Sequence, residues 1–232
     1  MTDYLFEPPE VRSIPVKGEA AEYPVGRIFC VGRNYAAHAA EMGVEVDREA
    51  PFYFTKSPQA ALASGATLPY PPGTADLHHE MELALVIGKP VFRVGAEAAA
   101  GAVYAYGCAL DMTRRDLQQA GKDKRRPWDL GKDFEGAAVF APLTRAADMG
   151  EIGPQRIHLE VNGETRQDAH LGELIHSVPE VIADLSKYYH LQPGDIIMTG
   201  TPAGVGAVVA GDRITGGIDG LDPIALTIGP AD

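Results

Sequence analysis

Alternating apolar and polar positions along this chain predict mostly β-strands. The two clearest runs are residues 79–87 and 103–112, where successive side chains would face opposite sides of a sheet. Shorter strand-like runs cover residues 27–32, 51–56, 157–161, 165–167, 195–199 and 224–228. Asn162-Gly163 separates two of these runs and is a strong signal for a tight hairpin turn.

Helical spacing is confined to short segments. Residues 34–42 are rich in alanine and are followed by Gly43, a residue typical of helix ends. Residues 113–120 predict a second helix. Residues 178–190 predict a third, with Ser177 as its N-cap.

Composition supports one compact domain. Of the 232 residues 45% are hydrophobic, enough for a sizeable core. We therefore expect a Pro-punctuated N-terminal arm at residues 1–26 and a single strand-dominated α+β domain at residues 27–232. The sequence has no apolar stretch of membrane-spanning length and no signal-peptide order at its start. Cys30 and Cys108 lie in separate apolar runs, which predicts buried free thiols and a cytoplasmic location.

The net charge of −12 argues against a nucleic-acid or anionic-membrane partner. The positive charge is unevenly distributed, because seven of the 20 Lys and Arg residues lie within residues 114–132. The ordinary interpretation is a solvated helix face. The alternative is an anion-binding rim on an otherwise acidic protein.

Two glutamates stand out in the first of the clear strands. Met81 and Leu83 would share the core face of this strand, and Glu80 and Glu82 would share the other. Two like charges on one face repel each other, and apolar surroundings would make both costly. Either the two glutamates lie on the wet face of an amphipathic strand, or a cation lies between them.

A third carboxylate arrives in the same way on the second clear strand. Asp111 shares a strand face with Ala105, Gly107 and Ala109, as if to leave room beside it. Three carboxylates on small-residue faces suit a hard cation with oxygen ligands, Mg²⁺ or Mn²⁺. A zinc-protease motif is excluded, because its second histidine would stand at Leu83.

Two further segments allow more than one interpretation. His38 and Glu41 are three residues apart on a predicted helix and would meet on one face, which by itself is usually a surface contact. Residues 200–206 look like a nucleotide-binding loop but lack its Gly-Lys-Ser/Thr ending, so a tight turn is the expected structure.

Taken in order, several motifs resemble the short, single-domain members of the fumarylacetoacetate hydrolase family. They are Val31-Gly32-Arg33-Asn34-Tyr35, His38 with Glu41-Met42, Phe54-Thr55-Lys56, His79-Glu80-Met81-Glu82-Leu83, Leu110-Asp111-Met112-Thr113, Gly131-Lys132 and residues 200–206. Residues 111–118, followed by Arg126-Pro127-Trp128, most resemble the branch that hydrolyses fumarylpyruvate.

The resemblance implies a mixed β-roll, a homodimer and one divalent ion, Mg²⁺ or Mn²⁺, per subunit. The roles it implies are as follows: Glu80, Glu82 and Asp111 bind the metal; His38 and Glu41 form a dyad on a lid helix; Lys132 lies beside the metal; and Arg33, Arg115, Gln118 and Thr201 bind substrate. Lys56 and Arg115 are expected to balance the second carboxylate of a fumaryl group.

The implied reaction is metal-dependent hydrolysis of a carbon–carbon bond in an acylpyruvate, with fumarylpyruvate giving fumarate and pyruvate. In it, His38 would activate water, and Lys132 and the metal would stabilise the developing enolate. Oxaloacetate decarboxylation or oxo-acid isomerisation on the same metal is an alternative, and a non-enzymatic metal-binding protein is another. The longer family members carry a further acidic ligand that Arg33-Asn34 does not supply, and Asp133-Phe134-Glu135-Gly136 also departs from the family pattern.

Overall fold

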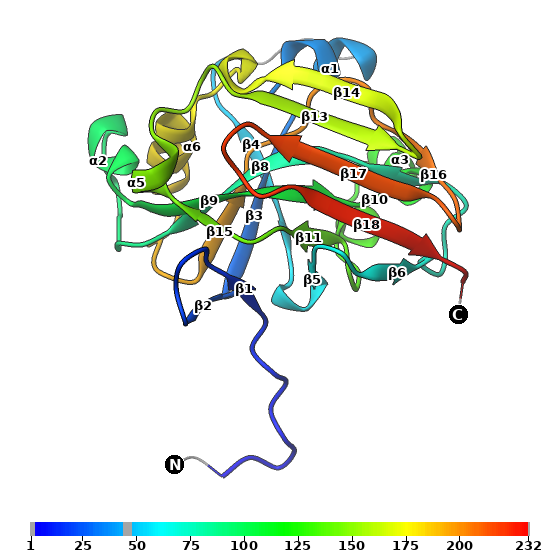
Figure 1. Cartoon of the computed structure of the whole chain (residues 1–232), viewed down its shortest axis with the longest axis horizontal. Coiled ribbons are helices and arrows are strands. Elements are labelled where there is room, and N and C mark those ends of the chain that lie inside the picture. The colour runs from blue at the N-terminus through cyan, green and yellow to red at the C-terminus, as the bar shows by residue number, and fades with distance from the viewer. Residues whose placement is uncertain (1–2, 44–47, 232) are drawn as a thin grey trace.

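The computed structural model describes residues 3–43 and 48–231 (Figure 1). Strands dominate, and two curled sheets pack face to face, with β13 lying on β8 and β17 on β9. The predicted class, a strand-dominated mixed α+β roll, is confirmed. An extended N-terminal segment projects away from the two sheets (Figure 1).

The larger sheet is mixed, with parallel pairs β15–β3 and β11–β5 among otherwise antiparallel neighbours. Its order is β4-β3-β15-β8-β9-β11-β5, with β12 also paired to β9. The bounds are β3 Arg27–Gly32, β4 Phe52–Lys56, β5 Ala61–Ala63, β8 Met81–Ile87, β9 Val103–Asp111, β11 Ala138–Phe140, β12 Thr144–Arg145 and β15 Asp195–Met198.

The second sheet has the order β14-β13-β17-β18-β6 and includes the predicted hairpin. Its bounds are β6 Thr67–Pro69, β13 Arg156–Val161, β14 Glu164–His170, β17 Arg213–Ile218 and β18 Ile224–Gly229. Asn162 and Gly163 both have positive φ at the turn, as the Asn-Gly pair predicted.

Two small sheets complete the strands. One has the order β10-β7-β16, with β7 Leu77–His79, β10 Thr113–Arg114 and β16 Gly206–Val208. The other pairs β1 Ser13–Pro15 with β2 Glu22–Pro24. The α-helices are α1 Ala36–Glu41, α2 Ala96–Ala100, α3 Arg115–Asp123, α4 Asp129–Lys132, α5 Ala146–Met149 and α6 Val178–Leu185, and 3₁₀ turns lie at Pro58–Ala60 and Leu171–Glu173.

The run predicted as one strand at residues 79–87 is two strands that meet at Glu80. β8 belongs to the larger sheet, and β7 pairs with β10 and β16 in the small one. The neighbouring strand divides in the same place, because β9 ends at Asp111 and β10 begins at Thr113. The two segments stay joined at this break by a backbone hydrogen bond of 2.9 Å from Asp111 N to Glu80 O. Acidic side chains therefore lie where two strands pass from one sheet to another.

The predicted N-terminal arm is only partly an arm. Ile14, Val16, Tyr23 and Val25 are all buried and belong to the main core. The alternation of apolar residues in β1 and β2 turns one side of this hairpin inward, so only the segment before it extends away. Residues 1 and 2 of the predicted arm lie outside the described residues.

Cys30 and Cys108 are buried and unbridged, as predicted. Among residues 3–43 and 48–231, the helices are all too short or too polar to cross a membrane.

Candidate functional site

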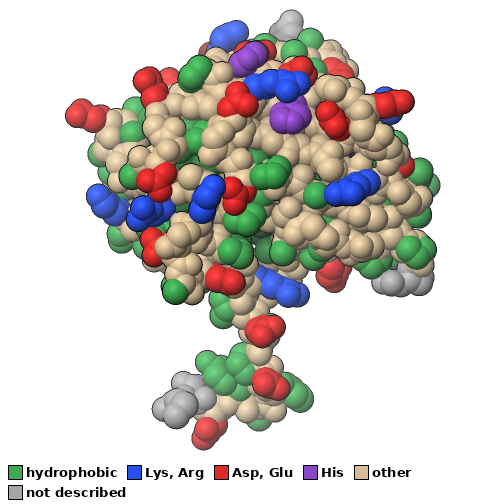
Figure 2. Space-filling model, in the orientation of Figure 1, with side chains coloured by type: hydrophobic (Ala, Val, Ile, Leu, Met, Phe, Trp, Pro, Cys, Tyr) green, Lys and Arg blue, Asp and Glu red, His purple; other side chains and the backbone are tan. Residues whose placement is uncertain are grey.

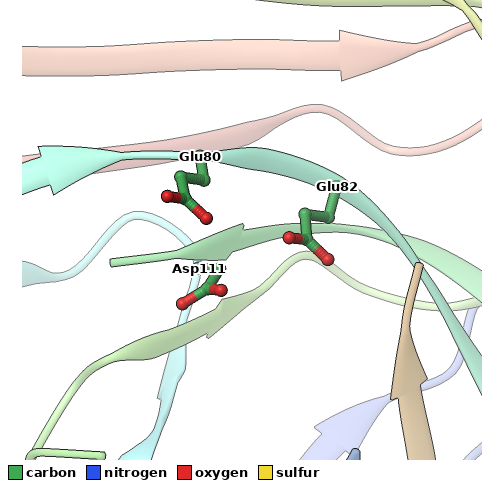
Figure 3. A group of neighbouring side chains, drawn as sticks. All are labelled: Glu80, Glu82 and Asp111. Carbon is green, nitrogen blue, oxygen red and sulfur yellow. The ribbon is translucent and has the colours of Figure 1, made fainter. Parts of the chain in front are cut away.

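Three carboxylates converge where the larger sheet meets the small three-stranded sheet. Figure 3 shows Glu80, Glu82 and Asp111 turned toward one another, and one oxygen from each lies within 4.8 Å of the others. Their exposed fractions are 5%, 2% and 0%, so these glutamates do not form a solvated strand face. We call these three residues the acidic cluster.

Cations neutralise two members of the acidic cluster. Lys132 Nζ lies 2.8 Å from Glu80 Oε2 and 2.7 Å from Asp111 Oδ2, and it donates to Thr113 Oγ1 at 2.7 Å. Burial would lower the pKa of Lys132, but Asp111 and Glu80 outweigh it and raise the value. Burial likewise would raise the pKa of Glu80, but Lys132 and Arg115 outweigh it and lower the value.

Glu82 differs from the other two carboxylates. It accepts a hydrogen bond from Gly200 N at 2.8 Å, and no Lys or Arg of the described chain forms an ion pair with it. Burial, and then the charges of Asp111 and Glu80, raise its pKa well above the ordinary value. A buried carboxylate without a cation beside two others is what a hard divalent ion would stabilise, so the donor set fits Mg²⁺ or Mn²⁺.

Lys56 pairs with the oxygen of Asp111 that Lys132 does not contact. Its Nζ is 2.8 Å from Asp111 Oδ1, its side chain is fully buried, and it donates to the backbone carbonyl oxygens of Met112 and Lys132. Among the described residues, Lys56 is not one of those that line the cavity beside the acidic cluster. Its charge is already used within the protein, which argues against the predicted contact between Lys56 and a substrate carboxylate.

Arg115 is similarly engaged at the start of α3. Its guanidinium group forms an ion pair with Glu80 and donates to Gln118 Oε1 at 2.7 Å and to His78 Nδ1 at 3.4 Å. Unlike Lys56, Arg115 lines the cavity, as does Gln118. We predicted that Arg115 would balance a distal substrate carboxylate. Because Arg115 already forms an ion pair with Glu80, it would have to contact both carboxylates at once.

The cavity itself brings together most of the predicted site residues. Its described lining is Val31, Gly32, Arg33, His38, Met42, Phe52, Phe54, Glu80, Glu82, Asp111, Arg115, Gln118, Lys122, Trp128, Lys132 and Thr201. Residues from the loop after β3, from α1, α3 and α4, and from the loop after β15 therefore surround the acidic cluster.

His38 and Glu41 meet on α1 at the edge of this cavity. His38 is 6% exposed, and its Nδ1 lies 3.2 Å from Glu41 Oε2. A carboxylate only accepts hydrogen bonds, so this contact places the proton on Nδ1 and leaves Nε2 as the basic nitrogen. Glu41 also accepts from Gly204 N at 3.1 Å, which ties the pair to the loop after β15.

Two buried amide side chains hold that loop, and sequence analysis assigned a role to neither. Asn34 donates to Thr199 O and His176 O at 2.9 Å each. Gln167 accepts from Met81 N at 2.9 Å and donates to Thr201 Oγ1 at 2.8 Å. Since Thr201 Oγ1 accepts this bond, its own proton is free to be donated into the cavity. Gln167 lies in a polar stretch, residues 164–168, where nothing in the sequence marks it.

Gly200 permits the loop after β15 to approach the loop after β3 closely, and its replacement should destabilise the fold. It has a φ of 96°, and an added Cβ would lie 2.8 Å from the Cβ of Asn34. Gly211 has a φ of 97° with nothing within 4 Å of an added Cβ, so it is a matched control. We expect Gly200→Ala to lower the free energy of unfolding by about 1–3 kcal/mol more than Gly211→Ala, measured by chemical denaturation. Equal losses would show that backbone strain alone matters at both positions.

Comparison with known proteins agrees with this architecture. The family described as "Fumarylacetoacetate (FAA) hydrolase C-terminal" matches residues 27–228. The fumarylpyruvate hydrolase of a Ralstonia species is 55% identical over 194 residues, which covers 82% of this chain and 100% of the relative. The mitochondrial oxaloacetate tautomerase FAHD1 of Homo sapiens is 41% identical over 212 residues, covering 87% and 94%.

Solved structures show the same similarity. The crystal structure of fumarylpyruvate hydrolase from Pseudomonas aeruginosa in complex with Mn²⁺ and pyruvate superposes with a TM-score of 0.95 at 43% identity. The match covers 98% of this chain and 100% of that one. Family, fold and extent of the match agree, and the chain belongs to the fumarylacetoacetate hydrolase family.

Proposed function

We propose that this protein is a metal-dependent hydrolase that cleaves the carbon–carbon bond of an acylpyruvate, converting fumarylpyruvate to fumarate and pyruvate. The observation that carries the proposal is the acidic cluster, with its unpaired Glu82, in one cavity with the His38–Glu41 pair. The 55% identical relative, a fumarylpyruvate hydrolase, supports the choice of substrate.

The acidic cluster would hold one Mg²⁺ or Mn²⁺ ion per subunit through Glu80, Glu82 and Asp111. The related Pseudomonas enzyme contains Mn²⁺, which supports a divalent ion without deciding between the two metals. When bound, such an ion would act as a Lewis acid toward the oxygens of the substrate's dicarbonyl unit.

His38 would remove a proton from the attacking water. In the neutral tautomer that donates from Nδ1 to Glu41, Nε2 is the nitrogen that accepts the proton, and Glu41 stabilises the imidazolium ion that forms. Water oxygen bonds to the distal carbonyl carbon, the bond to the methylene carbon then breaks, and its electron pair stays on the pyruvate fragment. The proton held by the His38 imidazolium is then returned to that methylene carbon, which completes pyruvate, and the acyl group leaves as fumarate.

The pyruvate end of the substrate would be bound by Arg115, Gln118 and Thr201. All three line the cavity, and the free hydroxyl proton of Thr201 suits a carboxylate oxygen. Lys132 would offset the developing negative charge on the enolate, and Lys56 would act indirectly by fixing the orientation of Asp111.

We also propose that the protein is a homodimer. Tyr4, Leu5 and Phe6 on the projecting N-terminal segment are 68%, 96% and 85% exposed. Figure 2 shows apolar side chains gathered on this segment, well away from the body of the molecule. A second copy of the chain would cover them. Light scattering should give twice the chain mass, and the mass of one chain would contradict the proposal. The cytoplasmic location inferred from the free thiols stays a prediction.

Oxaloacetate tautomerisation is a second candidate, because several relatives at 38–41% identity are oxaloacetate tautomerases. Decarboxylation of oxaloacetate on the same ion is a further alternative. A purely metal-binding role is disfavoured by the histidine pair, which ion binding does not need.

A substrate panel separates these reactions. With Mg²⁺ present, fumarylpyruvate and acetylpyruvate should lose their enol absorbance as pyruvate appears in equal amount. Oxaloacetate should turn over more slowly. If the enol absorbance of oxaloacetate changes rapidly while neither acylpyruvate yields pyruvate, tautomerisation is the activity and the proposal is wrong.

A further inference from the structure

Two cations line the cavity without an acidic partner in the described part of the chain. Arg33 follows β3 and Lys122 lies near the end of α3, and no ion pair or side-chain hydrogen bond joins either to residues 3–43 or 48–231. The other cations of the cavity, Arg115 and Lys132, both form ion pairs with the acidic cluster. Unpaired cations are unexpected in a chain with 32 acidic and 20 basic residues.

An aromatic wall connects these two cations. Lys122 Nζ lies 5.1 Å from the ring centroid of Trp128, and Arg33 Cζ lies 5.4 Å from that of Phe52. The two rings pack edge to face with centroids 5.5 Å apart. The arrangement therefore carries a positive charge over each of two contacting rings.

The same wall continues to the acidic cluster. Phe54 packs against Trp128 with a centroid distance of 5.9 Å, and Lys132 Nζ lies 5.0 Å from the Phe54 ring. An extended ligand held at the cluster by one end would thus lie along aromatic faces toward Arg33 and Lys122. A planar, conjugated acyl chain suits such a surface.

The charges around Lys122 favour an anion beside it. Burial, followed by the nearby charges of Arg115 and Arg33, lowers the pKa of Lys122 to about 8. Glu80 acts in the opposite direction, and Lys132 adds to the lowering. A carboxylate bound between Lys122 and Arg33 would relieve this repulsion.

We propose that Lys122 and Arg33, on the wall formed by Phe52 and Trp128, bind the distal carboxylate of a dicarboxylic acylpyruvate. This pair takes the place of Lys56, whose charge Asp111 uses, and of Arg115, which contacts Glu80 and which we assign to the pyruvate end of the substrate. The inference rests on the proposed function and deepens it. The enzyme selects substrates whose acyl group ends in a carboxylate over those with a neutral acyl group.

Lys122→Met tests this inference, because methionine keeps the unbranched length and removes the charge. For fumarylpyruvate we expect KM to rise roughly 10- to 100-fold with kcat little changed, since a charge-assisted contact to a non-reacting group is lost. For acetylpyruvate, which has no distal carboxylate, we expect a much smaller change. The ratio of the two kcat/KM values therefore falls.

Lys124→Met is the matched control. Lys124 is the C-cap of α3, is exposed and does not line the cavity, so this variant should keep the wild-type ratio. Equal losses on both substrates in Lys122→Met would show a structural or head-group role, and unchanged kinetics on both substrates would show that Lys122 binds no distal carboxylate. Either result overturns the inference.

The pH dependence gives an independent readout. Lys122 is charged below its pKa of about 8 and neutral above it, so the kcat/KM ratio of fumarylpyruvate to acetylpyruvate should fall as pH rises through 8. Arg33, Arg115, Glu80 and Lys132 face the same group, and the ratio removes effects common to both substrates. The fall should be absent in Lys122→Met. A persisting fall would assign it to another group.

Failure of the proposed function would look different. Wild-type protein would then hydrolyse neither acylpyruvate, and calorimetric titration with fumarate would still test the subsite. Weaker fumarate binding by Lys122→Met than by wild type and Lys124→Met would support it. Equal binding by all three would refute it.

Discussion

His38→Ala should lower acylpyruvate hydrolysis by on the order of 100-fold or more, the usual contribution of a general base. The expected loss is in kcat, because His38 is needed for attack by water rather than for substrate binding. Steady-state rates at fixed Mg²⁺, followed by substrate absorbance, would measure it. Loss of CO₂ from oxaloacetate needs no activated water, so any decarboxylation should survive much better.

A second His–Glu pair in the chain provides a matched control. His170 and Glu173 have the same three-residue spacing, with Nδ1 3.7 Å from Oε1, but their side chains are 57% and 54% exposed. His170→Ala should leave both reactions unchanged. Equal losses of hydrolysis and decarboxylation in His38→Ala would show that His38 supports binding in general, and its assignment as the base would be wrong.

Glu82→Gln should abolish activity by removing one of three charged oxygen ligands for the ion. We expect divalent-ion affinity to fall by more than about 100-fold, beyond the effect of losing an outer-shell partner. The same change removes the cost of burying a carboxyl group that has no cation partner, so the metal-free variant should melt at a higher temperature than metal-free wild type.

Calorimetry with Mn²⁺ and thermal melts with and without the ion would separate these two effects. Wild-type protein should gain stability on adding the ion, and Glu82→Gln should not. Asp195→Asn is the control, because Asp195 is also buried but forms an ion pair with Arg27 away from the cavity. It should melt earlier yet keep the shift on adding the ion. A full ion-induced shift in Glu82→Gln would exclude Glu82 as a ligand.

Much of the fold could be predicted from alternation and turn residues. The strands at residues 27–32, 157–161 and 195–199 form within a residue of their predicted bounds, and the Asn162-Gly163 hairpin was predicted with its turn. Local pattern did not reveal β17, where Gly216 and Gly217 interrupt the apolar run. The helix predicted at residues 178–190 ends at Leu185, and the chain beyond it forms a bridge between Leu191 and Val91.

The part of the site that lies on strands could be predicted, because alternation shows which side chains share a strand face. Alternation singled out Glu80, Glu82 and Asp111 but left a solvated face and a cation site both open, and the structure brings the three together in a buried cluster. Alternation could not show that the strands divide at Glu80, because that break depends on pairing with β10 and β16. It also could not separate Lys56, buried behind Asp111, from Lys122, which lines the cavity, since both are lysines at element ends.

Hydrolysis of fumarylpyruvate in ¹⁸O-labelled water tests the central claim most directly. If water attacks the distal carbonyl carbon, one labelled oxygen should enter the newly formed carboxylate of each fumarate, detected by mass spectrometry, with pyruvate released in equal amount. Fumarate without the label would rule out attack by water at that carbon. Release of CO₂, or an isomer with all its carbon atoms still joined, would contradict carbon–carbon bond hydrolysis.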